Sequence, residues 1–407
     1  MTIAPATIAR RDDAVGVPTP MAATSGRRRV IELTLALLPM GLVLTFTRGT
    51  NMDLDIYRGA LVDMLHGGSA YDYAVFVKEV GANLGFIYPP FASLVMMPLA
   101  LVPEAVGAVV MAGVTTLLVM LALLGCIGAI DTHRLRVGRK EVSLLVVALA
   151  SLPIAVSIPA LSNMTLGQIS FAIAAVVLID VTLLPARWRG TLVGLVGAIK
   201  LTPMILVPYY LVTRQWRAAI NASVAFALAT AVSAAVRWSD TIRYLFHPEV
   251  VSNSLGNLSR ADNWSIYGVL SRFGLDGSTR TVVWLLGSAL VLAAALWRAR
   301  RHSLQGQELE ATLVMGLAAG LVMVATWPHH LLFCVVACAV LAMERPAIGF
   351  PVLVLATIGG ELLPESPGNW MVLLIISLVV LGLPGRARRA PRTTPLDAAR
   401  HPVPDAA

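Results

Sequence analysis

The chain has 407 residues, of which 57% are hydrophobic and only 13% are charged. Soluble domains carry about 25% charged residues, so this composition excludes an ordinary soluble protein and indicates a helical bundle that crosses a membrane many times. The net charge of +8 comes from short clusters of Lys and Arg between apolar runs. Such clusters are typical of cytoplasmic loops and lack the single basic face of a nucleic-acid-binding protein.

The two ends of the chain have the composition of disordered tails. Residues 1–29 begin with a stretch rich in Ala, Pro and Thr and finish with an arginine triplet, directly before the first apolar run. This pattern predicts a cytoplasmic tail followed by a retained first span. Residues 385–407 are predicted to be a second cytoplasmic tail, so the transmembrane domain is expected to cover residues 30–384.

Apolar runs between these tails predict an all-α bundle of about twelve membrane spans, some of them broken. The clearer candidates are roughly 30–47, 105–130, 141–160, 165–185, 218–236, 281–299, 310–326, 329–343, 347–362 and 368–384. Two further runs are ambiguous. Residues 87–103 open on YPPF, and residues 190–213 carry Lys200 and Pro203 in their middle.

The charged connectors allow two arrangements of the ambiguous runs. If every basic connector is cytoplasmic, 87–103 does not cross fully and 190–213 enters the membrane and returns as a broken helix. If both runs cross once, the basic segments 131–140 and 186–190 lie outside. The positive-inside rule favours the first arrangement, and broken backbone is tolerated at membrane depth where it lines a cavity.

Both arrangements place two long polar loops, 48–86 and 237–280, on the extracytoplasmic side, with both termini in the cytoplasm. The opposite side holds only short basic connectors. A transporter spreads polar groups through its spans and often shows an internal repeat. We see no clear repeat, so the asymmetry favours a reaction site at one membrane face.

The first loop opens with two acids, Asp53 and Asp55, just after a strongly apolar run. The segment that follows, DIYRGALVDMLHGG, has an apolar helical face and predicts an amphipathic helix in the plane of the membrane interface. A carboxylate at this junction meets lipid-borne and aqueous substrates and can act as a general base. The alternative is a solvated acid that is stabilised by the positive end of a helix dipole.

Other polar residues stand out against apolar surroundings. Lys200 is the one Lys or Arg between Thr191 and Val212, and a charge inside a span indicates function unless the side chain reaches the interface. His329 and His330 follow Trp327-Pro328, and adjacent histidines cannot both face one site on a regular helix. The alternative interpretation is that both histidines lie in a loop at the membrane interface, beside a tryptophan of the kind that is enriched there.

The second loop is rich in groups that bind anions and sugars. Its arginines can form bidentate hydrogen bonds to a phosphate, although ordinary loop polarity explains any one of them equally well. The candidates there are Arg243, Arg260, Asp262, Asn263, Trp264 and Arg272.

Seven motifs in order resemble one family. They are DLDIY, GGSAYDY, FIYPPFASLVMMPLALVP, NMTLGQIS, GAIKLTPMILVPYYLVTRQWRA, NWSIYGVLSRF and WPHHLLF, across roughly residues 50–335. This order resembles the polytopic GT-C glycosyltransferases that use polyprenyl-phosphate-mannose, and among them the actinobacterial α-1,2-mannosyltransferases that elongate phosphatidylinositol mannosides. The chain departs from the family where a Ser-Pro segment often precedes the histidine pair, since it reads ATWPHHLLF.

The resemblance implies an extracytoplasmic site in the plasma membrane and an inverting displacement that turns a β-linked donor into an α-linked product. It places the base role on Asp53, which fits the family's acid-to-tyrosine register, with Asp55 as the second choice. The residues implied in binding the donor phosphate or the substrates are Lys200, Arg260, His329, His330, Tyr88, Gln168 and Asn263.

The partners implied are the polyprenyl-phosphate-mannose donor, a lipid-anchored mannoside acceptor and membrane lipid. Because the leaving group is a lipid monophosphate and no acidic cluster resembles a metal site, we predict a reaction that needs no metal and no other cofactor. Arabinofuranosyl donors and a lipomannan acceptor stay open within this class. The alternative classes are a secondary transporter or flippase and a noncatalytic assembly factor.

Overall fold

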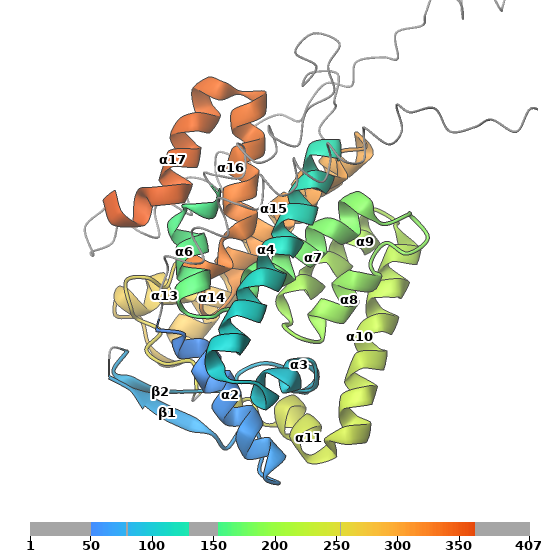
Figure 1. Ribbon diagram of the computed structural model, residues 1–407. Coiled ribbons are helices and arrows are strands. Elements are labelled where there is room, and N and C mark those ends of the chain that lie inside the picture. Colours follow the sequence, from blue (N-terminus) through green and yellow to red (C-terminus); the bar gives the residue numbers. More distant parts are fainter. Residues whose placement is uncertain (1–49, 79, 130–153, 253, 363–407) are drawn as a thin grey trace, which may run out of the picture.

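The computed structural model describes residues 50–78, 80–129, 154–252 and 254–362, and these form an almost wholly helical bundle (Figure 1). Several predicted segments lie outside the described residues. They are the tails 1–29 and 385–407, the spans 30–47 and 368–384, and the first part of the span 141–160.

Three helices among the described residues are long and apolar enough to cross a membrane. They are α4 (Glu104–Ala129), α10 (Trp216–Val236) and α14 (Gly277–Leu304). Each helix lies where the hydropathy pattern predicts a span, which confirms these three elements. In Figure 1, α4 and α10 run along the bundle as long rods.

The later apolar helices are shorter than a full span, which needs about 20 apolar residues. They are α15 (Glu308–Val322), α16 (Leu332–Glu344) and α17 (Pro346–Leu362). Most residues of α15 are buried, including Met315 and Leu317. Hydropathy alone does not distinguish such a core helix from a lipid-facing one, so the twelve spans stay a prediction.

A sharp bend joins α6 (Ile158–Thr165) to α7 (Ser170–Leu183), whose axes differ by 120°. Gly167 makes the turn with a φ of +68°, and a β-carbon there would collide with the Leu54 side chain. Glycine adopts this conformation without strain. The segment SNMTLGQ (162–168) is therefore a helix end and a tight turn, and the turn places Gln168 in the interior.

Residues 190–213 form a broken hairpin of α8 (Thr191–Gly197), the 3₁₀ helix η2 (Thr202–Ile205) and α9 (Leu206–Val212). Helix α8 runs beside α10 in the same direction, because Gly190 and Gly194 lie against Ala218 and Ala222 in turn. Helix α9 then ends just before α10 begins. Both ends of the segment thus lie at the start of α10, which is the geometry that the first arrangement requires.

Glu308, at the start of α15, holds the base of this hairpin together. Its Oε2 accepts hydrogen bonds from the Tyr209 hydroxyl at 2.5 Å and from Gln215 Nε2 at 2.9 Å, and Arg189 Nη1 lies 4.0 Å away. Asp180 of α7 accepts the backbone N–H of Gly190 at 2.7 Å, where α8 begins. These contacts fix the end of the hairpin next to α10, and the break near Lys200 lies at the opposite end, between α8 and η2.

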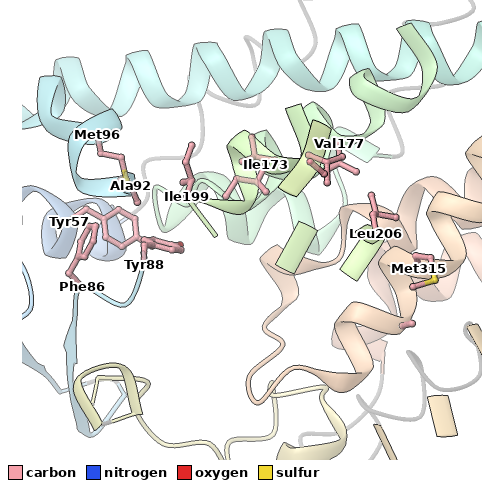
Figure 2. Packing of buried hydrophobic residues seen from close by; sticks show 14 of the residues in the cluster. Tyr57, Phe86, Tyr88, Ala92, Met96, Ile173, Val177, Ile199, Leu206 and Met315 are labelled. Atoms are coloured by element: carbon pink, nitrogen blue, oxygen red, sulfur yellow. The ribbon is translucent and has the colours of Figure 1, made fainter. Parts of the chain in front are cut away.

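The first loop begins with α2 (Met52–Leu65), which packs against α3 (Pro90–Met96) and the 3₁₀ helix η1 (Met97–Leu101). The predicted apolar face of α2 exists, but it contacts protein rather than lipid. Figure 2 shows Tyr57 of α2 among Phe86, Tyr88 and Ala92. Each such buried apolar side chain contributes about 1.5–3 kcal/mol to stability. The run 87–103 gives only short helices, and about 12 helical residues cannot cross a bilayer.

Two elements of the loops differ from the all-α prediction. Strands β1 (Ala74–Val77) and β2 (Ala82–Gly85) form an antiparallel hairpin, with Ala74 opposite Gly85. The β-branched and aromatic residues of AVFV favour a strand, and the segment is too short for a helical period to show. The second loop holds the short helices α11 (Trp238–Phe246), α12 (Glu249–Ser252) and α13 (Ile266–Arg272).

Candidate active site

The position of Asp53 is set by the backbone at the start of α2. The N–H groups at a helix start have no partner within the helix. Here the N–H groups of Asp53 and Leu54 donate to the Leu166 carbonyl at 3.0 and 3.2 Å, at the end of α6. This contact docks α2 onto the turn at Gly167. The Asp53 side chain therefore meets the residue that follows the turn, Gln168.

A chain of hydrogen bonds leads from Asp53 into the aromatic core. Gln168 Nε2 donates to Asp53 Oδ2 at 2.6 Å, so its Oε1 faces the other way and accepts from the Tyr88 hydroxyl at 3.0 Å. Because Tyr88 has given its one proton, the Tyr57 hydroxyl donates to it at 2.9 Å. Tyr57 lies four residues after Asp53, on the same face of α2.

Lys200, at the hairpin tip, lies next to this chain. Its Nζ donates to Ser170 Oγ at 2.9 Å, lies 2.9 Å from His330 Nε2, and lies 5.3 Å from the centre of the Tyr88 ring. An ammonium group has three donors, so one remains for a ligand. Within the described part of the chain, Lys200 forms no ion pair at 4.0 Å or less.

Both histidines of the WPHH segment face the site. They lie on the 3₁₀ helix η3 (Pro328–His330), with ring centres 4.4 Å apart and ring planes at 83°. On a regular α-helix only one of two adjacent histidines could face a site. These two lie on a short 3₁₀ helix instead, and both line the same cavity. His329 is 3% exposed, and neither of its ring nitrogens has a hydrogen-bond partner among the described residues. Burial, and then the charge of Lys200, hold the pKa of His329 well below 6.5.

A third group comes from the second loop. Arg260 donates to both carboxylate oxygens of Asp262, from Nε at 2.9 Å and from Nη2 at 2.8 Å. The guanidinium carbon lies 5.9 Å from the centre of the Trp327 ring. Trp327 directly precedes the η3 helix, so the Arg260–Asp262 ion pair lies beside the segment that carries the two histidines.

These groups line one cavity of about 810 Å³. That volume lies in the range of sites for small organic ligands. We call Asp53, Gln168 and Lys200 the helix wall, because helix ends and turns place them. We call Arg260, Asp262 and Trp327 the loop wall. The apolar remainder of the lining includes Leu201, Ile205, Trp284 and Val322.

The cavity separates the predicted residues into two sets. The residues that line it are Asp53, Tyr88, Gln168, Lys200, Arg260, His329 and His330. Asp55 is exposed and faces a separate shallow groove with Arg58, Asp63 and His66. Asn263 is fully buried behind the loop wall and bonds to backbone groups, so the structure does not place it in contact with a substrate.

Sequence reasoning named Asp262 only among the general candidates of the second loop, and it missed three residues of the site as binding candidates: Tyr57, Ser170 and Trp327. A signal existed for Tyr57, since its spacing of four from Asp53 puts both on one helical face. Asp262 stands two residues from Arg260, which is a local ion-pair spacing. No sequence pattern connects Ser170 with Lys200, because a tertiary contact joins them.

Burial changes the acid chemistry of Asp53. It raises the pKa of this carboxyl from 3.8 to about 6, while the Gln168 hydrogen bond and then the Lys200 charge act in the opposite direction. A carboxylate with a pKa near neutrality is a better proton acceptor than an ordinary aspartate and is still ionised at pH 7. The cavity thus combines a base, a cation and neutral imidazoles.

A membrane-embedded helical protein with a base and a cation in one enclosed cavity has the features of a group-transfer enzyme. The family model of glycosyltransferase family 87 matches residues 86–328, more than half of the 407 residues. The chain belongs to this family and is a glycosyltransferase. The matched range includes Tyr88, Gln168, Lys200 and Arg260, and it lies between Asp53 and His329.

Individual relatives agree with the family. The chain is 31% identical over 289 residues to a polyprenol-phosphate-mannose-dependent alpha-(1-2)-phosphatidylinositol mannoside mannosyltransferase of Mycobacterium tuberculosis, which covers 69% of this chain and 67% of the relative. It is 30% identical over 323 residues to the enzyme of the same name in Mycolicibacterium smegmatis, covering 75% and 73%.

A third relative bears a narrower name. It is a polyprenol-phosphate-mannose-dependent alpha-(1-2)-phosphatidylinositol pentamannoside mannosyltransferase of Mycobacterium tuberculosis, 32% identical over 358 residues, covering 83% of this chain and 80% of the relative. No solved structure matches the chain. Membership of a glycosyltransferase family favours an enzyme over the transporter and assembly-factor alternatives.

Proposed function

We propose that this protein moves mannose from polyprenyl-phosphate-mannose to a lipid-anchored mannoside, a phosphatidylinositol mannoside, and forms an α-1,2 linkage at the extracytoplasmic face. The observation that carries the proposal is the joint position of Asp53 and Lys200 on one wall of the cavity, bridged by Gln168 and Ser170. The names of the relatives support the donor, the acceptor and the linkage.

Asp53 acts as the general base. The acceptor hydroxyl attacks C1 of the donor mannose, and its proton passes to the Asp53 carboxylate. The bond between C1 and the phosphate oxygen breaks as the new glycosidic bond forms. Attack from the face opposite the phosphate inverts C1, which turns a β-linked donor into an α-linked product. The Gln168 amide orients the carboxylate, because it occupies one carboxylate oxygen at 2.6 Å.

Lys200 stabilises the leaving group. Polyprenyl phosphate gains negative charge as it departs, and a cation at that position lowers the barrier. Lys200 suits this role because no carboxylate among the described residues pairs with its ammonium, whereas Arg260 is paired with Asp262. His329 contributes unpaired nitrogen atoms at the same cavity for a substrate hydroxyl or phosphate oxygen.

The distribution of basic residues supports an extracytoplasmic location for the site. Arg189 lies at the base of the broken hairpin and Lys200 at its tip, so the cavity lies away from the basic connectors 186–190 and 213–217, which the structure describes. Basic connectors favour the cytoplasm. A reporter fused after Lys140 in the full chain should therefore give a cytoplasmic signal, and an extracytoplasmic signal there contradicts this orientation.

The transfer itself is tested with the purified full chain in lipid vesicles. Radiolabelled polyprenyl-phosphate-mannose is supplied with phosphatidylinositol mannosides of increasing mannose number, and the product is digested with an α-1,2-mannosidase. We expect label in a longer phosphatidylinositol mannoside and its release by the digestion. If no acceptor gains label, the proposed reaction is wrong.

We propose that the reaction needs no divalent metal, since a monophosphate leaving group can be stabilised by Lys200 alone. Among the described residues, no three His, Cys, Asp or Glu side chains come together as metal ligands. Transfer rates in excess EDTA should match those with added Mg²⁺ or Mn²⁺. A rate that EDTA abolishes and a metal restores would contradict this part of the proposal.

A further inference from the structure

We infer that the loop wall, formed by Arg260, Asp262 and Trp327, is a binding site for the acceptor sugar, separate from the place of the donor phosphate at Lys200. The inference rests on the proposed function, which supplies the two substrates. It assigns to Arg260 a different ligand from the donor phosphate that the family resemblance implied. The ligand class is a pyranoside with neighbouring hydroxyl groups, such as the terminal mannose of a mannoside.

The first argument is the charge of the loop wall. Arg260 places two nitrogen atoms on the two oxygens of Asp262, at 2.9 and 2.8 Å, so the pair is neutral as a unit. A phosphate that bound to Arg260 would have to compete with this carboxylate or lie beside it, and like charges repel. Lys200 has no such acid within 4.0 Å among the described residues. An anion therefore binds at Lys200 and a neutral ligand at the loop wall.

The second argument is the hydrogen-bonding capacity of the pair. A carboxylate offers about four lone-pair positions, and Arg260 uses two of them. The remaining positions can accept hydrogen bonds from two adjacent sugar hydroxyls. The side chains of Arg260 and Asp262 are 34% and 37% exposed, so a ligand can reach the polar edge of the pair. Trp327 adds a large apolar surface, which suits the C–H face of a pyranose ring.

The third argument is that hydrogen bonds tie the two segments of the loop wall together without a ligand. Asn263, between Asp262 and Trp264, donates from Nδ2 to the Val324 carbonyl at 3.2 Å, and its Oδ1 accepts the Thr326 N–H at 2.9 Å. Trp264 N–H donates to the Thr326 carbonyl at 2.8 Å. These bonds join the loop that carries Arg260 to the segment that carries Trp327.

Arg272 of α13 completes this support. Its Nη1 donates to the carbonyls of Arg260 and Asn263 at 2.7 and 2.9 Å. A binding site that is ordered in advance does not lose conformational freedom when the ligand arrives. This explains why Asn263, which contacts no cavity, belongs to one of the motifs that suggested a binding role. It is a positioning residue for the loop wall.

The test separates acceptor binding from donor binding. Initial rates of the vesicle-reconstituted full chain are measured with each substrate varied in turn, for wild type, Asp262→Asn and Trp327→Phe. We expect Asp262→Asn to raise the acceptor KM about 10-fold or more and to change the donor KM less than about 2-fold. Trp327→Phe should raise the acceptor KM by a smaller factor.

A matched control is Asp72→Asn, since Asp72 also pairs with an arginine, Arg243, at 2.6 Å but does not line the cavity. Both of its KM values should stay within about 2-fold of wild type. An Asp262→Asn variant whose donor KM rises while its acceptor KM is unchanged overturns the inference and returns Arg260 to the phosphate. Equal rises in both KM values, or a fall in kcat alone, overturn it as well.

Direct binding keeps this inference separate from the proposed reaction. Methyl α-mannoside is titrated into wild type and into both loop-wall variants, and tryptophan fluorescence is followed. Polyprenyl phosphate binding, measured on the same samples, shows that each variant is folded. Sugar binding that is lost in Asp262→Asn supports the loop wall even if no transfer occurs. Sugar binding that is unchanged in both variants contradicts it.

Discussion

The two walls of the cavity hold their charges in different ways. On the helix wall, Asp53 and Lys200 belong to the same buried network but do not form an ion pair with each other, and a glutamine and a serine lie between them. On the loop wall, Arg260 and Asp262 neutralise each other directly. Separated charges remain available to a reacting proton and a leaving phosphate, whereas a closed ion pair suits recognition of a neutral ligand.

The largest expected effect is on the helix wall, at the base. Asp53→Asn keeps the shape of the side chain but removes its basicity, so kcat for mannosyl transfer should fall by about 10²–10⁴-fold. Asp55→Asn is the matched control, since Asp55 is exposed and faces another groove. Its kcat should stay within about 3-fold of wild type. Asp53→Asn with near-wild-type turnover would remove Asp53 from the base role.

The next effect concerns the leaving group. Lys200→Met removes the cation, and kcat should fall by about 100-fold, while Lys200→Arg should restore part of the loss because it keeps the charge. Lys78→Met, on an exposed position of the first loop, is the control and should leave the rate unchanged. If Lys200→Met only raises the acceptor KM, the ammonium binds the acceptor and the two walls have exchanged roles.

A pH profile sharpens the comparison within the helix wall. Because burial raises the pKa of Asp53 to about 6, the base is protonated and inactive below that pH. We expect kcat/KM to fall about tenfold per pH unit below the apparent pKa. The charge of Lys200 lowers the pKa of Asp53. In Lys200→Met the midpoint of the profile should therefore move to higher pH, and a midpoint that stays in place contradicts their coupling.

A smaller effect tests how the helix wall is positioned. Gly167→Ala puts a side chain on a residue with a φ of +68° and against Leu54, so the unfolding free energy should fall by at least about 1–2 kcal/mol. Thermal unfolding of the detergent-solubilised protein measures this change. Gly113→Ala, on α4 with open space around it, is the control and should not lower the melting temperature. Equal melting temperatures would contradict the need for glycine at the turn.

The sequence predicts the identity of many site residues, but it predicts little of how they are arranged in space. Lys200 stood out because a charge in an apolar run is costly, and Asp53 stood out because it follows such a run. The preference for Asp53 over Asp55 came from the family register, and the structure adds a physical difference, since only Asp53 faces the cavity. The sequence does not predict the hairpin β1–β2 or the core position of α15, because short strands and fully buried helices have no distinctive hydrophobic periodicity.

The sequence by itself determined a membrane-embedded helical protein, the broken run at 190–213 and the residue types of a transferase, since composition, hydropathy and isolated charges are local properties. The tertiary structure decided which of these residues meet. Asp53, Gln168, Lys200 and His330 come from four separate segments, and only the docking of α2 on the turn at Gly167 and the return of the broken hairpin bring them together. Likewise, the neutrality of the loop wall depends on which carboxylate pairs with the Arg260 guanidinium in the folded loop.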